Sequence, residues 1–150
     1  VLNGKSGRLF NRLVKQEGLA TGASAGNYVR KYLSSFEISV QLKAGVSPAK
    51  VEKIIWEEIK KIQTDGVTPR ELKKVKNQSY ARTVRSFKNL DHLATQLAFY
   101  ETYGDWRLLV EFPEKLANVK LDEVKQVAEK YFHYSGSTTG RIVNSEEVLP

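Results

Sequence analysis

Hydrophobic residues recur at helical spacing in two segments of the first half of the chain. Within residues 6–18 they fall on one face of a helix, with Gly18 as C-terminal cap; this face comprises Leu9, Phe10, Leu13 and Val14. Ser47 and Pro48 predict the start of a second helix, because serine can cap free amides and proline fits the first turn. Gly66 ends that helix, whose buried stripe is Val51, Ile54, Ile55, Ile59 and Ile62.

The segments between these two helices have the pattern of strands. Residues 36–43 alternate strictly between apolar and polar, which predicts a strand with one face in water; the apolar positions are Phe36, Ile38, Val40 and Leu42. The small residues from Ala20 to Ala25 predict a partner strand. Residues 27–35 connect the two, so we expect an antiparallel pair with a long connection.

The clearest local signal is the sequence TPRE at residues 68–71. Thr68 as cap, Pro69 at the first helical position and Glu71 three residues after the threonine make a capping box. We expect one long helix from this point to about Tyr103, with a kink in residues 86–91 because of its length. Its apolar positions are Leu72, Val75, Val84, Phe87, Leu90, Leu93 and Leu97.

The last third of the chain predicts two more helices and a strand. Gly104 ends the long helix, and Asp105 caps a helix through residues 106–112 that Pro113 bends or divides. Residues 121–132 form the final helix, with an inward face of Leu121, Val124, Val127, Ala128 and Tyr131. Residues 137–143 are the last strand candidate. The fold class is therefore α+β: an antiparallel sheet packed against several helices, one of them long.

Composition restricts the functions that are open to the chain. It has 150 residues and no cysteine, which excludes disulfides, thiolate metal sites and cysteine nucleophiles. No apolar run is long enough to cross a bilayer, so we expect a soluble protein without membrane insertion. The compartment is left unknown by the sequence, with the bacterial periplasm and the cytoplasm both open.

The chain carries a net charge of +7, and the excess lies in residues 70–88. Lys74, Arg82 and Arg85 share one helical face with the neutral Gln78. Aromatic residues do not alternate with these cations, so a solvated face is favoured over a nucleic-acid-binding stripe.

No catalytic or metal-binding motif is present in the chain. His92 and His133 are the only histidines, and their spacing cannot place two metal ligands on one helical face. The sequence GKSG at residues 4–7 lacks the spacing of a phosphate-binding loop, and the adjacent pairs Glu57–Glu58 and Glu146–Glu147 point to different faces. We therefore name no catalytic residue and no metal ligand, and the substrate-binding residues stay unknown.

The order of the segments resembles the pitrilysin/insulinase family of zinc peptidases, the inverzincins whose motif is HxxEH. The resemblance covers nearly the whole chain; its most specific parts are SGRLF followed by KQEGLA, then GVTPRELKKVKNQ, and GDWR ahead of the final helix. It implies two homologous units, each of two related α+β lobes, that face one another across a peptide-degrading chamber. Residues 1–150 would form the second lobe of one unit, with upstream residues missing.

The resemblance also implies what this chain lacks. The HxxEH motif and the downstream glutamate ligand belong to the first lobe, so zinc is expected in the full-length parent and not in this chain. Some units of the family carry an arginine and, seven residues later, a tyrosine that hold the substrate; the matching positions here are Val14 and Thr21, which lack those groups. Without this arginine–tyrosine pair, the chain looks more like the zinc-bearing unit than like the unit that holds the substrate. Lys120 stands where relatives begin the last helix with threonine or serine.

These observations lead to three hypotheses about function. The first is a supporting lobe of a zinc-dependent peptidase, inactive alone, whose partners are the upstream lobe, a second homologous unit and a peptide substrate. The alternative is a non-catalytic relative that acts as a scaffold. A binding module for nucleic acid depends on net charge alone and is not favoured. A lobe without its companion would expose apolar surface, through which a second copy can pair with it.

Overall fold

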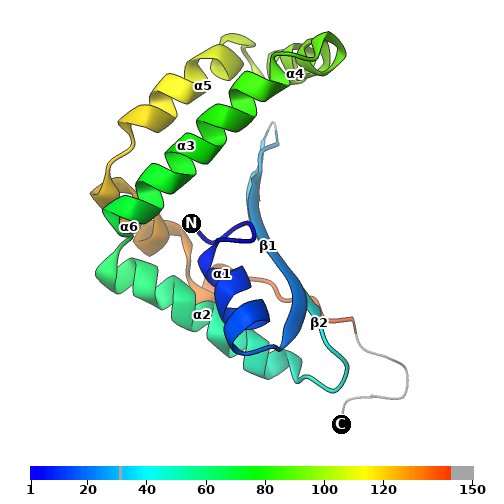
Figure 1. Cartoon of the computed structure of the whole chain (residues 1–150), viewed down its shortest axis with the longest axis vertical. Helices are drawn as coiled ribbons and strands as arrows, with labels where there is room; N and C mark the ends of the chain where they lie inside the picture. The colour runs from blue at the N-terminus through cyan, green and yellow to red at the C-terminus, as the bar shows by residue number, and fades with distance from the viewer. Residues whose placement is uncertain (31, 143–150) are drawn as a thin grey trace.

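The computed structural model describes residues 1–30 and 32–142. The expected antiparallel strand pair and the helices around it are present, which confirms the α+β class (Figure 1). The elements in chain order are α1 (Arg8–Phe10), η1 (Asn11–Gln16), β1 (Ala20–Tyr28), β2 (Ser35–Leu42), α2 (Pro48–Asp65), α3 (Pro69–Ser86), α4 (Leu90–Tyr103), α5 (Arg107–Asn118), α6 (Leu121–Tyr131) and η2 (Tyr134–Gly136).

The predicted first helix has an irregular core-facing turn. It begins as one α-helical turn, α1, and continues as a π-helix, η1, before Gly18 turns the chain at a φ of +63°. Leu9 and Leu13 are fully buried, whereas Phe10 and Val14 are only half-buried. Hydrophobic spacing located this helix but not its π turns, because both helix types bury the same two leucines.

The sheet has two strands in the described residues, with β1 antiparallel to β2. β1 extends to Tyr28, three residues beyond the predicted small-residue run. The register shifts between Ala20 and Gly22, which leaves Thr21 as an extra residue in β1. Phe36 lies at the far end of β2 and packs its ring against Phe132 at a centroid distance of 4.9 Å.

The core lies where the sheet, the first helix and α2 meet. The expected stripe of α2 is confirmed: Val51, Ile54, Ile59 and Ile62 are buried, and Ile55 packs against them. Ser47 makes no side-chain capping bond at the start of α2, although Pro48 occupies the first turn as predicted. Gly66 ends the helix at a φ of +74°.

The single long helix predicted from residue 69 is wrong: the structure has two helices, α3 and α4. The break lies within the predicted kink region, because the Asn89 side chain accepts a hydrogen bond from the His92 amide at 2.8 Å and starts α4 anew. Figure 1 shows α3 rising from the end of α2 toward the far end of the strand pair, α4 at its far end and α5 returning beside α3. We call these three helices the arm.

Of the two effects predicted for Pro113, a bend or a division, division does not occur, because Pro113 lies inside α5. The end of the chain differs from the sequence prediction at two points. In α6 only one stripe reaches the core, so Val127 and Tyr131 are exposed instead of inward-facing. The described part of the last strand candidate, residues 137–142, is not a strand; Glu52 of α2 binds it through Thr139 at 3.1 Å and Arg141 at 2.7 Å. Residue 143 lies outside the described residues.

The start of α6 at Lys120 is regular despite the unusual residue. Lysine offers no side-chain acceptor, but the Glu123 carboxylate accepts the Lys120 amide at 2.7 Å, which is half of a capping box.

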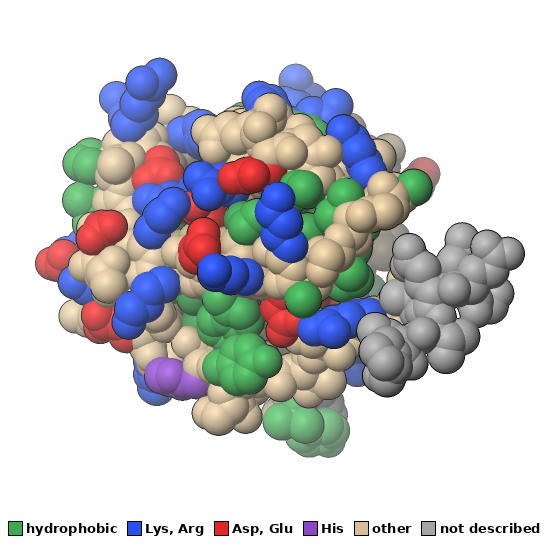
Figure 2. Space-filling model, turned by 90° about the horizontal axis from the view of Figure 1, so that it is seen from below, with side chains coloured by type: hydrophobic (Ala, Val, Ile, Leu, Met, Phe, Trp, Pro, Cys, Tyr) green, Lys and Arg blue, Asp and Glu red, His purple; other side chains and the backbone are tan. Residues whose placement is uncertain are grey.

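Many apolar side chains remain at the surface. On the face shown in Figure 2, hydrophobic side chains lie between alternating cations and carboxylates. Exposed large side chains occur on the strand connection and on the arm, among them Leu33, Leu90, Phe99, Val110 and Phe112. Apolar side chains are thus exposed in several elements, and the pairing of a second copy through such a surface stays a prediction. Within residues 1–30 and 32–142, no helix combines the length and the apolarity needed to cross a membrane.

Candidate functional site: the junction of α1 and α3

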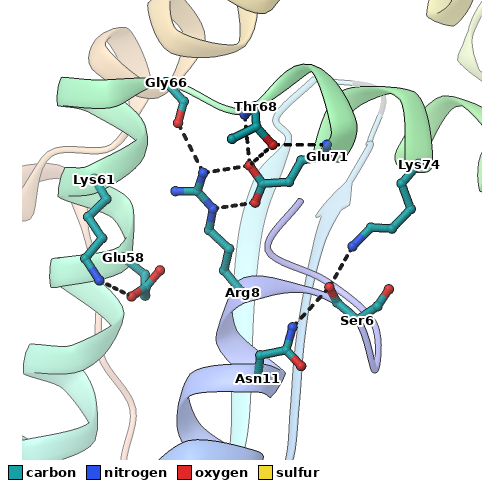
Figure 3. A network of polar contacts seen from close by, with 9 residues as sticks. All are labelled: Ser6, Arg8, Asn11, Glu58, Lys61, Gly66, Thr68, Glu71 and Lys74. Carbon is teal, nitrogen blue, oxygen red and sulfur yellow. Dashed lines mark hydrogen bonds and ion pairs between the residues drawn. The ribbon is translucent and has the colours of Figure 1, made fainter.

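An ion pair joins the first helix to the start of α3 (Figure 3). Arg8 Nε donates to Glu71 Oε1 at 2.7 Å, and Nη2 donates to Oε2 at 2.8 Å. Nη2 also donates to the carbonyl of Gly66 at 3.2 Å. Both charged side chains are about one-fifth exposed, at 19% and 23%. The bidentate arginine–carboxylate geometry fixes the direction as well as the distance between the two helices.

Glu71 has a second role in the capping box predicted from the sequence. Its Oε2 accepts the Thr68 amide at 2.9 Å, and Thr68 Oγ1 accepts the Glu71 amide at 3.2 Å. Hydrogen bonding by Arg8 is the main cause that lowers the pKa of Glu71 to about 2. The carboxylate therefore stays ionised at neutral pH and cannot act as a proton donor.

Two smaller contacts complete the junction. Lys74 Nζ donates to the carbonyl of Ser6 at 2.7 Å, and Asn11 donates to the same oxygen at 3.3 Å. On the neighbouring α2, the buried Glu58 accepts from Lys61 at 2.6 Å (Figure 3). Each of these contacts holds backbone or helix positions in place. The arrangement can therefore position the two helices.

Sequence reasoning identified Thr68 and Glu71 but missed Arg8. The capping box is a local signal of four residues, whereas Arg8 lies 63 positions away from Glu71 in the chain. No periodicity links residues at that separation. An arginine beside a fully buried leucine in a short helix was the available signal, because such a residue reaches polar partners next to the core.

The positions that match the substrate clamp of relatives lie one on each side of Gly18. Val14 packs against the cluster around Leu13 and is half-buried. Thr21 is the extra residue of β1, and its hydroxyl donates to the carbonyl of Gln41 at 3.3 Å. Both side chains are therefore engaged within the lobe.

The two histidines are far from forming a metal site. His92 is exposed at the start of α4, and Nε2 of the exposed His133 lies 2.9 Å from the carbonyl oxygen of Lys130. Within residues 1–30 and 32–142, no group of three or more histidine, aspartate or glutamate side chains could hold a metal ion. The donors present here do not fit zinc, so no step of a reaction is assigned to zinc in this chain.

Comparison with known proteins identifies the family. The peptidase M16 inactive domain matches residues 1–79, which include the first helix, both strands, α2 and the Thr68–Glu71 capping box. The chain belongs to this family. The match confirms the resemblance to the pitrilysin/insulinase family.

Similar proteins give the same picture at lower identity. The zinc protease PqqE of Helicobacter pylori is 26% identical over 136 residues, which cover 91% of this chain and 31% of that protein. The inactive peptidase domain of a proposed zinc protease from Bordetella parapertussis has a TM-score of 0.84 at 23% identity, over 96% of this chain and 78% of that one. A protease from Helicobacter pylori has a TM-score of 0.80 at 23% identity, over 87% and 32%.

The relatives also show how much of a longer protein this chain matches. The chain spans about a third of the length of the curated relative, 31%. Structures at this identity show the fold alone. The M16 chain is thus a non-catalytic lobe of a peptidase-like unit.

Proposed function

We propose that residues 1–150 are the second lobe of one unit of a zinc-dependent peptidase, where they wall a peptide-degrading chamber and support the zinc-bearing lobe. The match to an inactive M16 domain is the observation that carries this proposal. The curated relative that supports it is a zinc protease about three times as long as the matched segment, which leaves room for the companion lobe and a second unit.

The geometry favours a structural role for this lobe over a catalytic one. The Arg8–Glu71 pair and the capping box use their charges and donors within the lobe. Val14 packs against the cluster around Leu13, and the Thr21 hydroxyl donates to the carbonyl of Gln41. A lobe of this kind contributes a rigid surface beside a reacting site that lies elsewhere. The zinc, the general base and the peptide substrate would then be held by the parent protein outside this chain.

A peptidase assay tests the proposal directly. The chain is mixed with a library of fluorogenic peptides and excess Zn²⁺, with and without a chelator, and the variant His92→Ala/His133→Ala serves as the control. We expect no turnover above the zinc-only background for either protein. Turnover that the chelator abolishes and the double variant lacks would overturn the assignment as a non-catalytic lobe.

Reading the gene upstream of Val1 separates an active parent from a scaffold. An HxxEH motif upstream, together with peptidase activity when the two lobes are expressed together, would agree with the proposed role of this chain in an active peptidase. A parent without HxxEH in any lobe would contradict that role and favour a scaffold relative of the same family.

A further inference from the structure

A row of exposed side chains runs along α3 at a regular spacing. The spacing between successive members alternates between three and four residues. The members are Arg70, Lys73, Asn77, Tyr80, Val84 and Phe87. This is the spacing of the contact positions of a coiled coil, and it places all six on one side of the helix. We call this row the α3 seam.

The seam is divided into a cationic half and an apolar half. Arg70 and Lys73 lie near the start of α3, whereas Tyr80, Val84 and Phe87 lie near its end and are 61%, 41% and 37% exposed. The opposite side of α3 carries Leu72, which is buried. Three neighbouring apolar side chains at helical spacing on the solvent side are therefore a second contact face of the helix.

Cations greatly outnumber carboxylates in and just after α3. Residues 69–88 contain seven cations, namely Arg70, Lys73, Lys74, Lys76, Arg82, Arg85 and Lys88, and one carboxylate, Glu71. Arg8 occupies that carboxylate. None of the seven cations forms an ion pair within residues 1–30 and 32–142, and Lys74 and Lys76 bind only backbone carbonyls. Two of the seven, Arg70 and Lys73, belong to the α3 seam, where they are exposed cations without an ion-pair partner in the described residues.

We propose that the α3 seam docks an acidic amphipathic helix of a partner protein. Carboxylates of that helix would face Arg70 and Lys73, and its apolar side chains would pack on Tyr80, Val84 and Phe87. Charge complementarity selects this occupant, because a partner helix of opposite sign gains both contacts at once. The seam of a second copy contains no carboxylate, so it would place Arg70 and Lys73 against cations or against apolar side chains and is disfavoured.

The proposal is separate from the proposed function. The seam belongs to this chain, and its docking needs neither zinc nor a peptidase activity in the parent. A failure of the peptidase assay above therefore leaves the proposal intact, and the reverse also holds.

A binding titration with a designed helix tests the α3 seam. The probe is a synthetic, side-chain cross-linked helix of 18 residues, the length of α3. Its contact positions are glutamates in the N-terminal half and leucines in the C-terminal half. When the probe lies parallel to α3, the glutamates face the cationic half of the seam and the leucines face the apolar half. Fluorescence anisotropy should give saturable one-to-one binding that weakens as salt is added. A peptide of the same composition in scrambled order should bind at least about tenfold more weakly.

Two matched valine variants locate the binding. Val84→Glu places a carboxylate in the α3 seam, whereas Val127→Glu places one on α6, where the side chain is 53% exposed. Both positions are on the surface, so both variants should fold. We expect Val84→Glu to raise the Kd about tenfold or more and Val127→Glu to change it less than about twofold.

Several results would overturn the proposal. These are no saturation by the probe, equal binding of the scrambled peptide, or equal effects of the two variants. Binding to phosphatidylserine vesicles that Val84→Glu abolishes, without binding to the peptide, would assign the α3 seam to a lipid surface instead. Dimerisation that Val84→Glu abolishes, measured by sedimentation without the peptide, would assign it to a second copy.

Discussion

At the residue scale, the Arg8–Glu71 pair links two parts of the chain that are distant in sequence. It is less than one-quarter exposed on both sides and has two hydrogen bonds in parallel. A charge-assisted pair of this kind stabilises the fold more than the exposed pairs elsewhere on the lobe, since water competes less for its partners.

Replacing Glu71 with glutamine should therefore destabilise the lobe. The variant leaves the largely buried Arg8 guanidinium without its counter-charge, and we expect a loss of about 2 kcal/mol in the free energy of unfolding. Urea denaturation followed by circular dichroism measures this loss. The matched control is Glu111→Gln, because its pair with Lys115 is at least half exposed, at 50% and 61%. That control should change the free energy by less than about 0.5 kcal/mol, and equal losses would contradict the role given to Arg8.

The same pair predicts a dependence of stability on pH. The pKa of Glu71 is lowered from 4.5 to about 2 in the folded lobe by the Arg8 hydrogen bonds. Its contribution is therefore complete above the pKa of the unfolded chain and is lost as the pH falls from about 4.5 toward 2. Urea unfolding across that window should show wild type losing about 2 kcal/mol more than Glu71→Gln. Parallel pH curves for the two proteins would rule out this contribution.

At the scale of elements, local sequence signals predicted where helices begin and end better than they predicted which elements are in contact. The capping box at Thr68 and the stops at Gly66 and Gly104 were correct because each depends on a few adjacent residues. The break between α3 and α4 was expected only as a kink. An asparagine within an otherwise helical pattern can either stay in the helix or cap a new one, and only the structure shows that Asn89 caps.

The faces of the last elements could not be predicted for a related reason. Periodicity placed Val127 and Tyr131 inward, but α6 meets α2 along a narrow stripe through Ala128, where Gln63 donates to the carbonyls of Ala128 and Phe132. The pattern of residues 137–142 fits a strand, yet Glu52 binds this segment to α2. Both outcomes depend on which partner is in reach, and a sequence pattern does not contain that information.

A comparison of two helix caps tests the break between α3 and α4. Asn89→Ala removes the side chain that accepts the His92 amide, and we expect a loss of about 1 kcal/mol together with faster hydrogen exchange in the first turn of α4. Ser47→Ala at the start of α2 is the control, because Ser47 makes no side-chain capping bond. We expect its effect to be under about 0.5 kcal/mol. If both alanines cost the same, Asn89 does not cap α4.

At the scale of the whole molecule, the arm reaches from the core toward the strand connection. The Tyr103 hydroxyl of α4 donates to the carbonyl of Val29 at 2.6 Å. This bond joins the end of the arm that is distant from the core to the connection between the two strands, which lies near α4 in Figure 1. The sequence predicted the helices of the arm but not this contact, because Tyr103 and Val29 are 74 positions apart.

Removing that hydroxyl should loosen the arm without unfolding the lobe. The chain has no cysteine, so spin labels at Ser34→Cys and Thr95→Cys report a single distance between the strand connection and α4. We expect Tyr103→Phe to broaden the distance distribution while global stability changes by less than about 1 kcal/mol. Tyr100→Phe is the control, because the described contact of Tyr100 is its ring against Phe99. An unchanged distribution in Tyr103→Phe would show that the bond does not restrain the arm.

The turn that brings Arg8 to Glu71 also sets a limit on sequence variation. Gly7 is buried, and a side chain at this position would overlap with the backbone carbonyls of Leu2 and Asn3. At Gly4 and Gly45 a side chain would enter open space, although both have a positive φ. In a saturation-mutagenesis library selected for folded protein, codon 7 should therefore retain glycine alone, whereas codons 4 and 45 should also retain asparagine.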